Sequence, residues 1–129
     1  MRWFLIAAAG LHIFFMIFEL FPWSVPLSVQ IASKKLPNLP GDEPFTVAQK
    51  EVHAALQRLL ATIVHNAGIY NGIVAGGLLW AAFGGDSARD VARVMLIGAA
   101  VAGAFGTATL KSPVTVAQAM VGVVGLLLL

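Results

Sequence analysis

The sequence predicts an all-α integral membrane protein, a single domain built as a bundle of four transmembrane helices. Of its 129 residues, 59% are hydrophobic and only 11% are charged. In an ordinary soluble domain about a quarter of the residues are charged. Four apolar segments follow one another along the chain, and about 20 apolar residues are enough for one helical crossing of a bilayer. Four crossings with short connections therefore account for nearly the whole chain.

The first span is expected over residues 3–21, and it ends before Pro22 because proline has no backbone N–H to continue a helix. Residues 24–45 are polar and form the one long loop that we expect, and loops of about 20 residues are usually functional or mobile. The apolar run after Arg2 also resembles the core of a signal peptide. It is longer than such a core and contains Glu19, so we interpret it as a membrane span.

The second helix is expected to be the longest. Thr46 and Gln49 have the spacing of a capping box at its start, and Gly84 and Gly85 end it. At about 1.5 Å per residue, a helix of about 37 residues is about 55 Å long, which exceeds the apolar thickness of a bilayer. We therefore expect residues 54–83 to cross the membrane and the turns before them to lie outside the hydrocarbon.

The third span is expected over residues 88–109 and the fourth over residues 113–129, with Ser112 as N-cap and Pro113 in the first turn. Basic residues are more numerous in the connections on the side of the long loop than on the side of the termini. Because connections rich in lysine and arginine stay in the cytoplasm, we expect the long loop to be cytoplasmic.

Composition and missing motifs exclude several kinds of function. The formal net charge of +2 comes from few and scattered residues, unlike the basic patch of a nucleic-acid-binding protein. Without cysteine the chain has no disulfide, thiol nucleophile or thiolate metal ligand. It also lacks a glycine-rich phosphate loop, a nucleophile elbow and a His-x-x-His or Glu-x-x-His pair, so we expect neither a cofactor nor a metal.

Polar side chains inside a span are candidates for function, because a charge in hydrocarbon costs about 2.5 to 3.5 kcal/mol on insertion scales. Glu19 is the ionisable residue well inside a span, and His12 precedes it by seven positions on the same helix face. The plainer interpretation of Glu19 is a carboxylate that reaches the membrane surface. The plainer interpretation of His12 is a buried histidine that hydrogen-bonds to a neighbouring group in the core.

The second helix carries the densest group of polar residues. Thr62, Asn66 and Tyr70 recur every four residues, with His65 and Asn71 beside them. Amides and hydroxyls also join membrane helices through hydrogen bonds, which is the plainer interpretation of each residue taken alone. Glycines at every fourth position, Gly68, Gly72 and Gly76, predict close approach of a neighbouring helix.

Depth in the membrane brings these groups together. Glu19 and Asn66 fall in one leaflet, and His12 falls level with Tyr70 and Asn71 near the middle. The last two helices add Thr107 and Gln118 to the same half, and Trp23 is either an interfacial anchor or a wall of the site. We therefore predict one shared site, with catalytic roles for Glu19, Tyr70 and Asn66, and ligand-binding roles for His12, Asn71, Gln118, Trp23 and Thr107.

Three stretches of the sequence carry a family resemblance: LHIFFMIFELFPW, HNAGIYNGIVAGGLLW and VAGAFGTAT. Together with Gln118 they resemble the domain-of-unknown-function 1304 family of small four-helix integral membrane proteins from bacteria and fungi. The resemblance implies the membrane fold but no activity, and the chain departs from the family pattern at Ala67, where a glutamine is expected. It also implies importance for Glu19, Asn66, Tyr70 and Asn71.

Three functions agree with these observations. In the first, an apolar small molecule such as a lipid or terpenoid binds at Glu19 and undergoes isomerisation, cyclisation or epoxide opening by general acid/base chemistry. Burial favours the neutral form of a carboxyl group, which can then donate a proton, while Asn66, Asn71 and Tyr70 orient the substrate.

The second function is proton-coupled transport by a homodimer, since the small multidrug resistance transporters are similar in size and helix count and have a glutamate in the first helix. The third is that of a non-catalytic membrane subunit. For all three functions we expect the lipid bilayer as partner, a location in the bacterial inner (plasma) membrane, and no nucleic acid.

Overall fold

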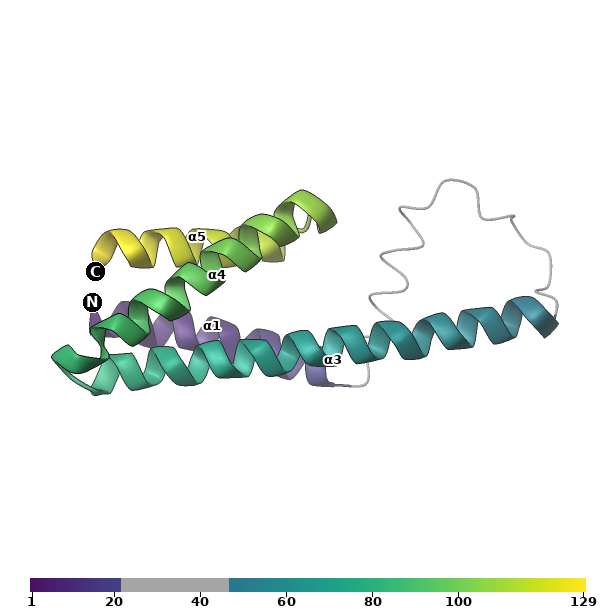
Figure 1. The fold of residues 1–129 in the computed structure, drawn as a ribbon, viewed down its shortest axis with the longest axis horizontal. Helices are drawn as coiled ribbons and strands as arrows, with labels where there is room; N and C mark the ends of the chain where they lie inside the picture. Colours follow the sequence, from purple (N-terminus) through teal and green to yellow (C-terminus); the bar gives the residue numbers. More distant parts are fainter. Residues whose placement is uncertain (22–46) are drawn as a thin grey trace. The chain divides into compact units, whose positions relative to one another are not determined.

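The computed structural model describes residues 1–21 and 47–129, and every regular element within them is a helix (Figure 1). Four α-helices and one 3-10 turn make up this part of the chain: α1 (Arg2–Leu20), α3 (Val47–Phe83), η1 (Asp86–Ala88), α4 (Arg89–Leu110) and α5 (Pro113–Leu128). The all-α class is confirmed. The loop expected over residues 24–45, the capping residue Thr46 and Trp23 lie outside the described residues.

Local sequence explains where the last two connections fall. α3 ends before Gly84, and Gly85 takes a φ of 73°, a left-handed conformation that glycine adopts without steric cost. Lys111 ends α4 with a φ of 51°, and its N–H donates to the Thr107 carbonyl at 3.1 Å. Ser112 then caps α5 as predicted, since its hydroxyl oxygen accepts from the Val114 N–H at 3.3 Å.

The chain divides into two compact units. The first contains Met1–Phe14 and Asn71–Leu129, and the second contains Phe15–Tyr70. α1 and α3 each contribute residues to both units, whereas α4 and α5 belong to the first. Within the first unit, the start of α1 and the end of α5 lie at the same end (Figure 1).

Alanine and leucine side chains form the core of the first unit. Its buried cluster consists of Leu5, Ala8, Ala9, Leu78, Ala92 and Leu96. α4 and α5 approach so closely that a Cβ added at Gly103 would lie 2.6 Å from the Ala119 Cα. A Cβ added at Gly122 would lie 2.7 Å from the Ala100 Cα, so this pair of helices requires glycine on both sides.

Two of the described helices, α1 and α4, are long and apolar enough to cross a membrane. α5 is apolar as well but has only 16 residues. The length and composition of α1 and α4 suit a membrane location.

Candidate functional site

A buried hydrogen bond joins α1 to α3 inside the first unit. The His12 Nδ1 lies 2.8 Å from the Asn71 Oδ1, and the two residues are 59 positions apart in the chain. His12 is fully buried and Asn71 is only 7% exposed. Since an amide oxygen can only accept, the Nδ1 of His12 carries the proton in this bond. His12 and Asn71, which the sequence predicts at the same depth in the membrane, thus contact each other directly.

Glu19 belongs to the second unit, where the end of α1 packs against Gly68 of α3. A Cβ added at Gly68 would lie 3.3 Å from the Glu19 Cβ and 3.0 Å from the Leu20 Cγ. The close approach predicted at Gly68 is therefore confirmed, and Glu19 is half-buried at this contact. The same prediction is wrong at Gly76 within the described part of the chain, because Gly76 is exposed and an added Cβ meets no described atom within 4 Å.

His65 shares the face of α3 that contacts the end of α1, because it precedes Gly68 by three positions. Its Nε2 is buried, and no group in the described part of the chain hydrogen-bonds to it. In the sequence, His65 is only a neighbour of the polar stripe and has no predicted role in the site. The spacing of three residues between His65 and Gly68 is the sequence signal that places His65 on the face of α3 that packs against α1.

Asn66 and Tyr70 point the other way. Both are exposed, and the Tyr70 side chain is 65% exposed. Thr62, on the same stripe, is exposed too, and its hydroxyl donates to the Arg58 carbonyl at 3.1 Å. Within the second unit the packed face of α3 is thus the one with Gly68, and the catalytic roles expected of Asn66 and Tyr70 stay predictions.

The remaining predicted ligand-binding residues lie on α4 and α5. The Thr107 hydroxyl donates to the Gly103 carbonyl at 2.7 Å and lies 3.3 Å from the Thr115 hydroxyl across the helix pair. Gln118 is half-buried on α5. The contact between Thr107 and Thr115 connects α4 with α5, and the ligand-binding roles of Thr107 and Gln118 stay predictions.

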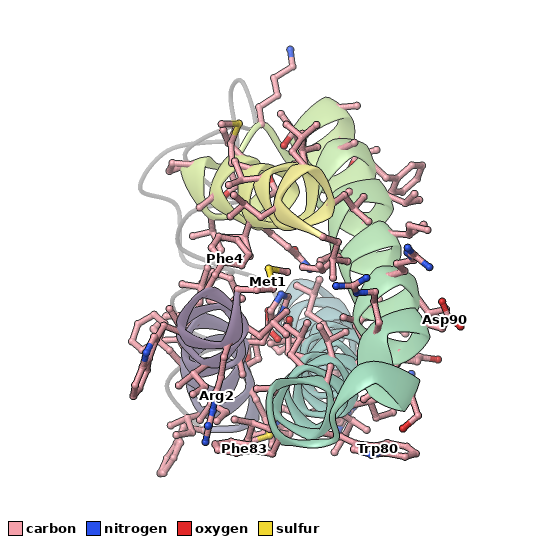
Figure 2. The ribbon with its side chains drawn as sticks, turned by 90° about the vertical axis from the view of Figure 1, so that its left-hand side faces the viewer. Met1, Arg2, Phe4, Trp80, Phe83 and Asp90 are labelled. Atoms are coloured by element: carbon pink, nitrogen blue, oxygen red, sulfur yellow. The ribbon has the colours of Figure 1, made fainter. Side chains whose placement is uncertain are left out.

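A pocket of about 150 Å³ opens at the end of the first unit where the chain starts. Arg2 and Arg89 supply its charged side chains, and Leu5 and Ala82 belong to its apolar wall. The Arg2 guanidinium lies 4.4 Å from the centre of the Phe83 ring, at the end of the unit that faces the viewer in Figure 2. Of the predicted site residues that the structure describes, none lines this pocket.

The sequence signature described as "Protein of unknown function (DUF1304)" matches residues 40–129, more than half of the chain. The chain belongs to the DUF1304 family. The match includes α3, α4 and α5, and with them Asn66, Tyr70 and Asn71. His12 and Glu19 of this DUF1304 protein precede the matched region. No curated protein and no solved structure matches the chain significantly.

Proposed function

We propose that this DUF1304 protein is an integral membrane protein whose four helices cross the bilayer. The support comes from its surface as well as from α1 and α4. Large apolar side chains are exposed on helix after helix: Trp3 is 80% exposed, Phe105 71% and Leu127 82%. Water disfavours so many exposed large apolar side chains, whereas hydrocarbon accommodates them, and a short helix such as α5 is matched by local thinning of the bilayer.

We further propose that an apolar small molecule with one polar group, of the lipid or terpenoid class, binds in the second unit. The observation that carries this proposal is the buried Nε2 of His65, which lacks a hydrogen-bond partner among the described residues. Leaving a buried polar atom unsatisfied costs about 1 to 3 kcal/mol. A polar group of a ligand recovers that energy, and the neighbouring apolar side chains accept its hydrocarbon part.

Glu19 supplies the chemistry in this proposal. Glu19 is half-buried where the end of α1 contacts Gly68, and His65 lies on the same face of α3. A carboxyl group shielded from water donates a proton to an alkene or an epoxide oxygen and recovers one from the product, as isomerisation, cyclisation or epoxide opening requires. The proposed reaction therefore proceeds by general acid/base catalysis with Glu19 as proton donor.

Native mass spectrometry of the protein purified from its membrane tests this function. We expect a co-purified small molecule, and Glu19→Gln and His65→Phe should each lower its occupancy by about tenfold, the effect of losing one buried hydrogen bond. Thr62→Val serves as a matched control, because it removes an exposed hydroxyl that bonds to the Arg58 carbonyl within α3. Equal occupancy in all variants, or no bound molecule in the wild type, would refute the proposal.

Proton-coupled transport by a homodimer is the second candidate, and the half-buried position of Glu19 favours it equally. Reconstituted liposomes separate the two. Proton flux that follows a gradient of a cationic substrate and disappears in Glu19→Gln would support transport over catalysis.

A further inference from the structure

The pocket at the end of the first unit shares no residue with the ligand site proposed above, and its charged side chains are both basic. Arg2 comes from α1 and Arg89 from α4. Of the lining residues that the structure describes, none is acidic. Met1 and Leu129 also line the pocket, and their main-chain charges, where free, are opposite in sign and cancel. The two arginines therefore give the pocket a net positive charge.

The charges of Arg2 and Arg89 are available to a ligand. Neither side chain forms an ion pair with a residue that the structure describes. The Arg2 guanidinium lies 4.4 Å from the centre of the Phe83 ring, a contact that leaves the N–H groups at the guanidinium edge free to donate. The carboxylate of Asp90 is already engaged, because it lies 2.8 Å from Arg93.

The start of α4 adds to the positive potential. Arg89 is the first residue of this helix, and Ala88 before it has no side chain that could cap the N–H groups of the first turn. Uncapped N–H groups and the positive end of the helix dipole attract anions. Within the first unit, Arg89 thus supplies its charge at the end of α4 that itself favours an anion.

The size and wall of the pocket suit a phosphate group with an apolar attachment. A cavity of about 150 Å³ holds a molecule of about the size of benzene, so a phosphate group fits with space left over. Leu5, Ala82 and Ala92 line the same pocket with hydrocarbon. An entirely polar anion would leave this part of the wall without a partner, whereas a phosphate ester with an apolar portion contacts both parts.

Aromatic side chains indicate the depth of this end of the unit in the membrane. Trp80 is 66% exposed and Phe83 is 62% exposed, and both lie with Arg2 at the end that faces the viewer in Figure 2. Trp3, next to Arg2 in the chain, is 80% exposed. Tryptophan gathers where the hydrocarbon meets the lipid headgroups, so the pocket opens at the level of the lipid phosphates.

We propose that this pocket binds the phosphate group of an anionic phospholipid, with Arg2 and Arg89 as its cationic contacts and with the glycerol carbons against Leu5 and Ala82. Arginine suits this task because its planar N–H groups bond to two phosphate oxygens at once. Free phosphate shares the same chemistry, but it has no apolar portion. The proposal rests on the membrane location proposed above, and not on the ligand site of Glu19 and His65.

Native mass spectrometry of the detergent-solubilised protein, titrated with phosphatidylglycerol, tests the site. We expect saturable binding, and Arg2→Gln and Arg89→Gln should each weaken it by about fivefold, the effect of one arginine beside an anionic lipid. Arg93→Gln is the matched control and should leave the affinity unchanged, because Arg93 is paired with Asp90 and does not line the pocket. Equal losses in all three variants, or no loss in any, would overturn the proposal.

Competing ligands identify the source of the phosphate. Phosphatidylcholine with the same acyl chains carries the same phosphate beside a choline cation, so it should bind more weakly than phosphatidylglycerol. Inorganic phosphate should displace phosphatidylglycerol only at far higher concentrations. Displacement by inorganic phosphate at concentrations similar to those of the lipid would assign the pocket to a soluble anion and overturn the lipid. Equal binding of the two lipids would overturn recognition by charge.

Two further measurements separate this proposal from those above. Alkaline extraction of native membranes should leave the protein in the membrane, and its release would refute the membrane location and the lipid site together. His65→Phe should leave the affinity for phosphatidylglycerol unchanged, because His65 does not line the pocket. Loss of phosphatidylglycerol binding in His65→Phe would show that the lipid occupies the other site, and would overturn the proposal for the pocket alone.

Discussion

At the scale of residues, the bond between His12 and Asn71 shows how this protein handles polar groups in an apolar interior. Both side chains are buried, and the His12 Nδ1 is hydrogen-bonded to the Asn71 Oδ1 at 2.8 Å. A bond in this place fixes both the rotation of α1 and that of α3, because a slip of either helix by one residue would leave two buried polar groups unsatisfied. The bond therefore selects one way of packing the two helices.

Substitution of this pair should be strongly non-additive. His12→Leu or Asn71→Leu alone leaves one buried polar group and should cost about 1 to 3 kcal/mol. The double variant removes both polar groups and should recover a large part of that loss. Thermal unfolding of all four proteins in one detergent measures the coupling, and additive losses would show that the bond does not hold the helices together.

At the scale of elements, glycines decide how closely the helices approach. Gly103 and Gly122 lie where α4 and α5 meet backbone to backbone, and the atoms that an added Cβ would meet are main-chain atoms of Ala119 and Ala100. Backbone atoms cannot rotate out of the way as a side chain can. The separation of α4 and α5 therefore depends on the absence of two Cβ atoms.

Gly103→Ala and Gly122→Ala should each destabilise the protein by about 1 to 3 kcal/mol, the usual cost of overpacking. Gly98→Ala is the matched control on α4, because an added Cβ there has open space around it. The control should be neutral or stabilising by up to about 1 kcal/mol, since alanine favours the helix. The midpoints of thermal unfolding compare the three variants, and equal losses would contradict the proposed backbone contact.

At the scale of the whole molecule, four crossings would determine on which side of the membrane each connection between helices lies. The start of α1, the η1 turn and the end of α5 would lie on one side of the membrane, and the α4–α5 connection on the other. Basic residues favour the cytoplasm for the side of the α4–α5 connection. The topology thus follows from how many of the helices cross.

Labelling of single cysteines with an impermeant maleimide tests this topology. Ser87→Cys in η1 should react in intact cells, and Lys111→Cys in the α4–α5 connection should react in inverted membrane vesicles. Both positions are exposed in the structure, so the membrane is the barrier that the reagent meets. Reaction of both cysteines from the same side would mean that α4 does not cross the membrane.

Several features of this protein follow from its sequence alone. The all-α class follows from long apolar segments separated by proline and glycine, and the start of α5 follows from Ser112 and Pro113. Membership of the DUF1304 family follows from the sequence match over residues 40–129. These features depend on neighbours in the chain, so local patterns are sufficient to predict them.

Which side of α3 faces α1 was decided only by the tertiary structure. Helical spacing determines that Asn66 and Asn71 stand about 140° apart around the axis, but it leaves the rotation of the whole helix open. Packing sets that rotation: Gly68 contacts the end of α1 and Asn71 bonds to His12, and Asn66 consequently points outward. Rotation of a helix depends on contacts between residues far apart in the chain, and the periodicity of a single segment contains no information about them.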